Sequence, residues 1–162
     1  MKTTQWRCLK LLYYQTFQSP IGPLSIYAND YHLIHLVIGV DKTIDAIWNE
    51  SHPILSQVSS QLQAYFQREL STFTLPILLQ GTPFQIAVWT ALKNIPFGQV
   101  MSYQQIAYQI GYPKASRAVG QACKRNPLLL VIPCHRVIGS NGELGGFTGG
   151  LDVKKWLLNH ET

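Results

Sequence analysis

The 162-residue sequence is poor in cysteine and contains no Cys-x-x-Cys pair. Its three cysteines, Cys8, Cys123 and Cys134, form an odd set, which excludes a framework of paired disulfides, and their spacing excludes a zinc ribbon. We therefore expect free thiols in a reducing compartment. Neither a metal ion nor a cofactor is expected.

Long hydrophobic runs are also missing. No uninterrupted apolar stretch reaches the roughly 18 residues that a membrane helix needs. The N-terminal segment MKTTQWRCLKLLYY lacks the apolar stretch and the small-residue cleavage site of a secretory signal. The sequence therefore predicts a cytoplasmic protein with no membrane partner. Its 46% hydrophobic and 13% charged residues can still bury the core of one domain or of two small ones.

Acidic residues are absent from the whole stretch between Glu69 and Glu143. The net charge of +5 arises entirely in residues 81–162, which contain eight lysines and arginines against three acids, whereas residues 1–80 are neutral. A field of one sign attracts polyanions, and nucleic acid is the first candidate. A scattered charge that only improves solubility is the alternative explanation.

Residues 1–80 are predicted to form a small α/β unit. Three strands are expected at 11–17, 23–28 and 33–39, and the turn-forming residues between them indicate an antiparallel meander. Apolar residues at helical spacing then predict one amphipathic helix over 55–70 that covers the sheet. We find no catalytic constellation in this unit.

Residues 81–162 are predicted to form a second unit. A first helix begins after Thr82, a good N-cap that is followed by proline. A helix capped by Ser102, a turn at Gly111 and a further helix over about 115–124 then match a helix-turn-helix, whose second helix enters a DNA groove. Helix pairs of this kind also occur in enzymes that never touch DNA, and that alternative stays open.

The second unit ends in three segments of different character. The apolar run over 127–139 is predicted to be strand-like, and the loop over 139–150 is rich in glycine, which permits close approach to a ligand. A simple flexible hairpin is the alternative for that loop. A last helix is expected over 151–161, with Leu151 and Trp156 among the residues that pack inward.

Cys134 lies in the stretch VIPCHRVIG, directly before His135 and Arg136. A buried structural cysteine is the commonest role after an apolar run. However, Pro133 interrupts strand pairing, so we expect the thiol to be accessible at the end of a strand. His135 and Arg136 add positive potential and a base, which favour the thiolate over the thiol.

A third group is expected to orient the imidazole of His135. The second unit offers three carboxylates for this role, Glu143 in the loop, Asp152 at the start of the last helix and Glu161 at its end. The residues alone therefore predict a nucleophilic thiolate with histidine and carboxylate support beside a basic helix-turn-helix. They do not identify the electrophile.

The segment IPCHRVIGSNGELGGFTGGLDVKKWLLNHE closely resembles the signature of the DNA O6-alkylguanine alkyltransferases, the methylated-DNA–protein-cysteine methyltransferase family of the single-function bacterial type. The likeness continues upstream through residues 81–127, and more loosely through 19–30 and 62–66. It implies an α/β (α+β) fold with a small N-terminal antiparallel-sheet, RNase H-like domain at 1–80. A C-terminal winged helix-turn-helix-like domain at 81–162 would bind DNA and carry the active-site cysteine.

The resemblance also implies roles for individual residues. Cys134 matches the acceptor that takes the alkyl group from guanine O6 and keeps it. His135 and Glu161 match the relay in which a bridging water deprotonates the thiol. Tyr103 matches the tyrosine that protonates guanine N3 as the base departs, and Arg117 matches the finger that enters the base stack after the target nucleotide flips out.

Further positions follow from the same resemblance. Asn126 matches the asparagine that hinges the helix-turn-helix to the active-site segment. The backbone of Cys134 and Val137 would hold the guanine edge, and Thr148 would meet O6. The other residues assigned to the substrate pocket are Phe147 and Leu129. The DNA-binding surface is assigned to Tyr103, Lys114, Arg117, Ala118, Lys124 and Arg125.

The implied function is DNA repair by irreversible, stoichiometric transfer of the alkyl group from O6-alkylguanine in duplex DNA, after base flipping. O4-alkylthymine is a further candidate substrate, alkylated double-stranded DNA is the expected partner, and a monomer is the expected state. Two other classes remain as alternatives, a thiol hydrolase of the Cys-His-Glu type and a helix-turn-helix transcription regulator.

One position departs from the family pattern, and two others leave a question open. Phe147 stands where many relatives have tyrosine, which removes a hydroxyl near the guanine pocket. Leu129 lies near a position that shapes the pocket in some relatives, so the preference for alkyl size stays open. Cys123, on the predicted recognition helix, is a second candidate for a reactive thiol, with a packed side chain as the favoured alternative.

Overall fold

The computed structural model describes residues 11–162, which form two compact units. The first unit contains the described residues up to Glu69 together with Thr74–Leu78, and the second contains Leu70–Phe73 and Leu79–Thr162. Cys8, one of the predicted free thiols, lies outside the described residues. None of the helices within residues 11–162 is long and apolar enough to cross a membrane.

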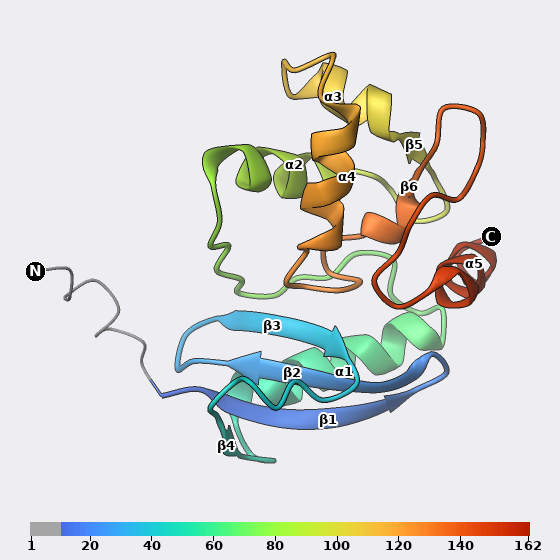
Figure 1. Cartoon of the computed structure of the whole chain (residues 1–162). Coiled ribbons are helices and arrows are strands. Elements are labelled where there is room, and N and C mark those ends of the chain that lie inside the picture. Colours follow the sequence, from blue (N-terminus) through green and yellow to red (C-terminus); the bar gives the residue numbers. More distant parts are fainter. Residues whose placement is uncertain (1–10) are drawn as a thin grey trace, which may run out of the picture. The chain divides into compact units, whose positions relative to one another are not determined.

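The first unit is built on a four-stranded sheet (Figure 1). Strands β1 (Tyr13–Ser19), β2 (Gly22–Ala28) and β3 (Leu33–Ile38) pair antiparallel, which confirms the predicted meander. A two-residue strand, β4 (Ile47–Trp48), adds to β1 in parallel and gives the order β3-β2-β1-β4. Gly22, with a φ of 104°, allows the tight turn that joins β1 to β2.

Helix α1 (Pro53–Phe66) packs on this sheet and supplies much of its core (Figure 1). Its residues Leu55, Val58 and Leu62 are completely buried. The helix ends before the predicted limit at residue 70, because the chain turns at Arg68, whose φ of 63° lies in the left-handed region and cannot continue a helix.

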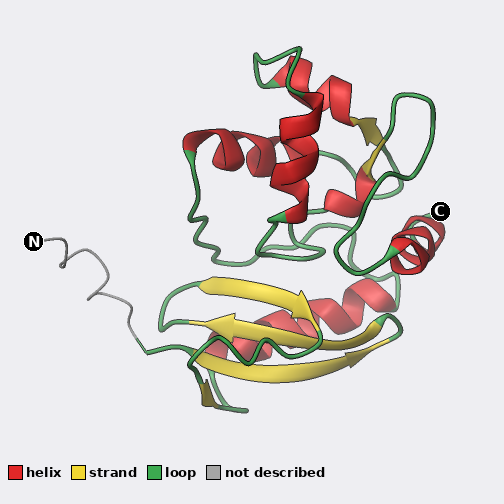
Figure 2. Ribbon diagram, in the orientation of Figure 1, coloured by secondary structure: helices red, strands yellow, loops and turns green. Residues whose placement is uncertain are grey.

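The second unit contains the predicted helices α2 (Pro83–Lys93), α3 (Tyr103–Gln109) and α4 (Ser116–Lys124) (Figure 2). The first two helices, α2 and α3, each begin with a capping box. In each, a hydroxyl oxygen accepts from the backbone N–H three residues on, and that residue's glutamine side chain accepts from the N-cap backbone. The pairs are Thr82 with Gln85 and Ser102 with Gln105.

The helix-turn-helix predicted from Ser102 onward is present. Gly111, with a φ of 84°, makes the turn after α3, and the backbone N–H of Tyr112 bonds back to the carbonyl of Ala107 at 2.9 Å. The two helices pack directly against each other. This arrangement leaves the basic residues of α4 exposed while Val119, Ala122 and Cys123 face the core.

A small parallel ladder connects α3 to the cysteine segment. Strand β5 (Met101–Ser102) pairs with β6 (Val137–Ile138), Met101 opposite Val137 and Ser102 opposite Ile138. Tyr103 begins α3 immediately after β5, and the 3-10 helix η1 (Cys134–Arg136) ends immediately before β6. The ladder therefore brings the start of α3 close to the segment that carries Cys134.

The strand predicted over 127–139 is wrong for most of its length. Only β6 at its end is a strand, and the rest forms a tight turn followed by η1. The backbone N–H of Ile132 bonds to the carbonyl of Leu128 at 2.9 Å, and Leu130 between them has a φ of 68°. Pro133 lacks a backbone donor for a ladder, and its carbonyl instead accepts from Arg136 at 3.0 Å in the 3-10 turn.

The last helix, α5 (Leu151–His160), is present, but its predicted inward residues are partly wrong. Leu151 is 53% exposed and Trp156 is 36% exposed. The inner face instead carries Lys154, Leu157 and, directly after the helix, Glu161, all of them buried. A buried lysine and a buried glutamate replace the apolar side chains because each finds hydrogen-bond partners inside the unit.

Candidate active site

Cys134 is the first residue of η1, in a segment that is buried from Leu128 to Val137. Only 6% of Cys134 is exposed, so the expectation of an accessible thiol at the end of a strand is wrong. The physical reason is that the chain turns inward at Leu130 and continues as a 3-10 helix instead of ending a ladder at the surface. Cys134 therefore lies inside the second unit and not at its surface.

The side chain of Asn126 joins the end of α4 to the cysteine. Its amide nitrogen Nδ2 donates to the carbonyl of Ile132 at 2.7 Å and lies 3.2 Å from Cys134 Sγ, and its Oδ1 accepts from the N–H of Leu128 at 2.9 Å. The structure thus brings together Asn126 and Cys134, both predicted site residues. Burial raises the pKa of the Cys134 thiol, whereas the hydrogen bond from Asn126 lowers it by stabilising the thiolate.

His135 and Glu161 form a buried pair. Nε2 of the imidazole lies 2.7 Å from Oε1 of Glu161, His135 is completely buried and Glu161 is 4% exposed. Of the three carboxylates that sequence reasoning left open, Glu161 is the one that contacts the imidazole. Burial lowers the pKa of His135, while the hydrogen bond and the charge of Glu161 oppose that shift.

Arg136 fixes the same carboxylate from its other side. Its Nε donates to Glu161 Oε2 at 2.8 Å and its Nη2 to Oε1 at 2.9 Å, while Nη1 donates to the carbonyl of Ile95 at 2.6 Å. This two-point contact holds the carboxylate of Glu161 in place and directs it at His135. Nδ1 of His135 has no hydrogen-bond partner among the described residues, so a neutral ring with its proton on Nε2 offers Nδ1 as a free base.

Lys154 is a residue that the sequence reasoning missed as part of the site. Its ammonium is buried, donates to the carbonyl of Val137 at 2.6 Å and lies 5.8 Å from the centre of the Tyr103 ring. Burial lowers its pKa, and negative charge on Cys134 and Cys123 raises it. The spacing of Lys154, Leu157 and Glu161 along one helix face is the sequence signal that could have indicated its burial.

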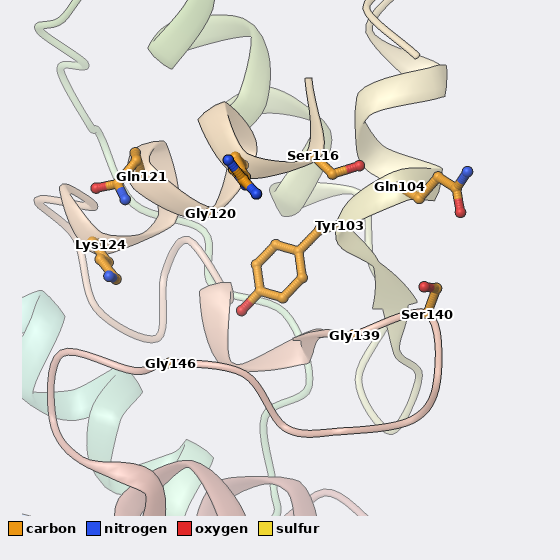
Figure 3. A pocket seen from close by; sticks show the side chains of 10 residues that line it. Tyr103, Gln104, Ser116, Gly120, Gln121, Lys124, Gly139, Ser140 and Gly146 are labelled. Atoms are coloured by element: carbon orange, nitrogen blue, oxygen red, sulfur yellow. The ribbon is translucent and has the colours of Figure 1, made fainter. Parts of the chain in front are cut away.

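Beside these residues lies a cavity of about 600 Å³ (Figure 3). Three of the predicted site residues, Tyr103, Arg117 and Lys124, are among those that line it, and Cys134 is not. In Figure 3 the Tyr103 ring lies in the middle of the cavity, between Gly120 of α4 and the loop that carries Gly146. The other residues that line the cavity are Gln104, Ser116, Gly120, Gln121, Gly139, Ser140 and Gly146.

Gly145 leaves the space that the Tyr103 ring occupies. A Cβ atom at Gly145 would lie 2.6 Å from the Tyr103 hydroxyl oxygen, so the loop packs directly on the ring. Burial raises the pKa of Tyr103 to about 12, and negative charge on Cys123 and Cys134 adds to the shift. The phenol therefore keeps its proton at neutral pH and can donate it or share it in a hydrogen bond.

The remaining predicted residues lie around this centre. Lys114, Ala118 and Arg125 are exposed, as are Arg117 and Lys124. Val137 is buried and its carbonyl accepts from Lys154, and Leu129 is buried as well. Phe147 is half-buried, and the exposed Thr148 donates its hydroxyl hydrogen to the carbonyl of Lys124 at 3.2 Å.

Cys123 faces the core from α4 and is 7% exposed. Burial raises the pKa of this thiol to about 12, and negative charge on Cys134 adds to the shift. Its position is that of a packed side chain.

Comparison with known proteins identifies two family models. The 6-O-methylguanine DNA methyltransferase DNA-binding domain matches residues 83–162, and the ribonuclease-like domain of the same methyltransferase matches residues 12–79. A methylated-DNA–protein-cysteine methyltransferase of Methanosarcina acetivorans is 45% identical over 93% of this chain and 98% of its own length. The constitutive enzyme of that name from Bacillus subtilis is 44% identical over 92% of this chain and 94% of its own.

Solved structures give the same result. The crystal structure of Mycobacterium tuberculosis O6-methylguanine methyltransferase matches with a TM-score of 0.85 and 41% identity, covering 93% of each chain. A structure of the Mycobacterium tuberculosis OGT protein in complex with DNA matches with a TM-score of 0.84 and 44% identity, covering 92% of each chain. The mixed α/β fold, with its N-terminal sheet and its C-terminal helical domain, is that of these structures.

Proposed function

The chain belongs to the methylated-DNA–protein-cysteine methyltransferase family, and on that premise we propose that it repairs DNA by moving the alkyl group of O6-alkylguanine onto Cys134. The single observation that carries the choice of residue is the buried arrangement around this thiol. Asn126 donates to its sulfur, and the next residue, His135, is held by Glu161 and offers a free Nδ1. Neither alternative class finds support among the relatives, which are methyltransferases.

Activation of the thiol follows from this arrangement. Glu161, fixed by Arg136, accepts the Nε2 proton of His135 in a hydrogen bond and leaves Nδ1 to accept another. A water molecule between Nδ1 and Sγ passes the thiol proton to the ring, which Glu161 then stabilises as an imidazolium. The amide of Asn126 and the nearby charge of Lys154 stabilise the thiolate that remains.

The transfer step is a displacement at the alkyl carbon. The thiolate forms a carbon–sulfur bond as the bond from that carbon to guanine O6 breaks, and the electron pair moves onto the guanine. Tyr103, which carries its proton at neutral pH, is assigned the protonation of N3 of the departing base. The product is a thioether, which a second thiol does not cleave, so each protein molecule acts once.

DNA has to present the base to this site. An O6-alkylated base is inaccessible inside a duplex, so it must be flipped out, and its weakened pairing lowers the cost. Arg117, exposed on α4 at the cavity, is suited to fill the vacated place in the stack. Val137, Leu129, Phe147 and Thr148 are assigned to the pocket that receives the base.

Binding of the duplex is assigned to the exposed basic residues of α4 and its ends, Lys114, Arg117, Lys124 and Arg125, with Ala118 between them. In the same proposal, residues 81–162 bind DNA and accept the alkyl group, while residues 1–80 are structural. We propose that the protein acts as a monomer, because one chain contributes the cavity, the thiol and the relay. We assign it to the cytoplasm, where a reducing environment keeps the acceptor thiol free.

The test is the stoichiometry of transfer. Mixing the protein with an excess of duplex that contains O6-methylguanine should give a burst that stops at one methyl group per protein, located by mass spectrometry on the peptide with Cys134. Cys134→Ser should abolish transfer and keep duplex binding, and Cys123→Ser is the matched control that should transfer normally. A steady rate beyond one equivalent, or transfer that survives in Cys134→Ser, contradicts the proposal.

A further inference from the structure

Helix α3 presents one face to solvent beside the cavity. Gln104 and Tyr108 are four residues apart, so they lie on the same face, while Ile106 and Ala107 face the core and are completely buried. Gln104 lines the cavity and projects from α3 beside it in Figure 3. Tyr108 therefore extends the cavity-side face of α3 by one helical turn.

Tyr108 is 77% exposed, the largest exposed fraction among the large hydrophobic and aromatic side chains of the described residues. No ring contact and no hydrogen bond of its hydroxyl occurs within residues 11–162. The neighbouring Tyr112 differs, since its ring packs edge-on against Phe84 at 5.5 Å between centroids. Packing of the unit accounts for Tyr112 and does not account for Tyr108.

The charge around this face favours one class of partner. Lys114 and Arg117 follow in the turn and in α4, both exposed, and no acid occurs in the sequence between Glu69 and Glu143. In a helix-turn-helix the first helix crosses the DNA backbone while the second enters a groove. Tyrosine hydroxyls are among the neutral groups that donate to phosphate oxygens and fix the register of a protein on DNA.

We infer that Tyr108 is a positioning residue that donates a hydrogen bond from its hydroxyl to a phosphodiester oxygen of the bound duplex. The inference rests on the proposed function, since duplex DNA is the occupant of this face. It adds to that function a second neutral contact from α3, besides that assigned to Tyr103, and separate from the charged contacts of α4. Tyr108 does not touch the reacting atoms, so its effect is on binding and placement of the duplex.

The test compares Tyr108→Phe with Tyr108→Ala and with the wild-type protein. Removing the hydroxyl alone should weaken duplex binding by roughly three- to tenfold, the effect of one hydrogen bond, and should leave reaction with free O6-methylguanine base unchanged. The slope of affinity against salt should also stay the same, because no charge is removed. Tyr31→Phe, which changes a tyrosine of the first unit that is 59% exposed, is the matched control and should bind normally.

A scan with neutral phosphates identifies the partner atom. The scan uses a series of duplexes, each with a single methylphosphonate at a different position. At one position the substitution should weaken binding of the wild-type protein but have no further effect on binding of Tyr108→Phe, which already lacks the hydroxyl. Normal binding by Tyr108→Phe, or additive losses at every position, overturns the inference, and loss in Tyr108→Ala alone shows a packing role instead. If the wild-type protein accepts no methyl group at all, the proposed function fails; if it does and Tyr108→Phe binds normally, only this inference fails.

Discussion

A methyl group added at Gly145 would lie 2.6 Å from the hydroxyl oxygen of Tyr103 and 2.9 Å from its ring carbon Cε2, so the glycine and the tyrosine are in direct contact. The loop therefore sets where the ring lies, and with it the shape of the cavity and the place of the phenolic proton.

Gly145→Ala should displace Tyr103 and slow methyl transfer on the order of 10- to 100-fold, because a shift of a reacting group by about 1 Å costs this much. Gly142→Ala is the matched control. Both glycines have a positive φ, 67° at Gly145 and 85° at Gly142, so both changes strain the backbone, but a Cβ at Gly142 meets nothing within 4 Å. Single-turnover rates on duplex DNA check the prediction, and equal losses in the two variants would contradict it.

Lys154→Met should damage both stability and chemistry. Loss of the ammonium leaves the buried carbonyl of Val137 without its donor, which costs about 1–3 kcal/mol of the free energy of unfolding. It also removes a positive charge that lowers the pKa of Cys134, so the pH profile of transfer should shift towards higher pH. Chemical denaturation and rate measurements against pH check the two effects.

Lys155→Met provides the comparison for Lys154, since Lys155 is the next residue and is exposed. It should be close to wild type in both measurements. A pH profile that is identical in Lys154→Met and wild type would mean that the ammonium has only a structural role.

The fall in the rate of methyl transfer at low pH, the acid limb of its pH profile, should reflect protonation of His135. Because burial lowers the pKa of His135, the ring stays neutral and able to accept a proton below the ordinary histidine value of about 6.5, and the rate should fall only at lower pH. Glu161 raises this pKa, so Glu161→Gln should move the acid limb further down while it slows the burst. The burst amplitude should still reach one methyl group per folded protein.

Asp152→Asn is the matched control for the carboxylate, because Asp152 lies exposed in the first turn of the same helix. Its profile should follow the wild type. An unchanged burst rate in Glu161→Gln would show that Cys134 is activated in another way.

Cys123 should be inert towards thiol reagents in the folded protein. With its pKa raised to about 12, almost none of it is thiolate at about pH 8, and it is 7% exposed. Alkylation by iodoacetamide followed by peptide mapping should label Cys123 only after unfolding. Labelling of Cys123 in the native protein, or methyl transfer to it from DNA, would contradict this.

Arg117→Ala should separate base flipping from chemistry. The side chain is exposed and is assigned to base flipping, not to activation of the thiol. Repair of duplex DNA should therefore slow much more than reaction with free O6-methylguanine base. Arg125→Ala, also exposed, removes the same charge beyond the end of α4 and should weaken duplex binding without this separation. Equal losses on the duplex and on the free base would assign Arg117 to the pocket or the fold.

Much of the fold could be predicted because its signals are local. Thr82 and Ser102 begin helices through contacts with residues three positions on, and Gly22 and Gly111 mark turns that need a positive φ. Strand β4 escaped prediction because two residues carry no periodic pattern, and its pairing with β1 depends on distant sequence. The family resemblance supplied the mixed α/β fold class, which the related structures confirm.

The cysteine segment shows where sequence patterns stop being informative. An apolar run such as 127–139 is typical of a strand, but here it is buried by the turn at Leu130 and by contacts from Asn126 and from α5 that no local pattern contains. Lys154 was missed for a related reason, because lysine is almost always exposed and its burial depends on a carbonyl made available by β6. The roles assigned to the individual site residues stay predictions until the variants are measured.

The pairing of β5 with β6 determines where this chain tolerates changes in length. Each strand has only two residues, and the register between them sets the positions of Tyr103 and of Cys134 relative to each other. One residue inserted between Ser102 and Tyr103, or between Arg136 and Val137, would turn one of these side chains away from the other. An insertion at Gly142, at an exposed loop position with open space around it, leaves that register intact. The number of residues next to this ladder is therefore as strictly constrained as the identity of the residue at position 134. The nearby loop, in contrast, can vary in length.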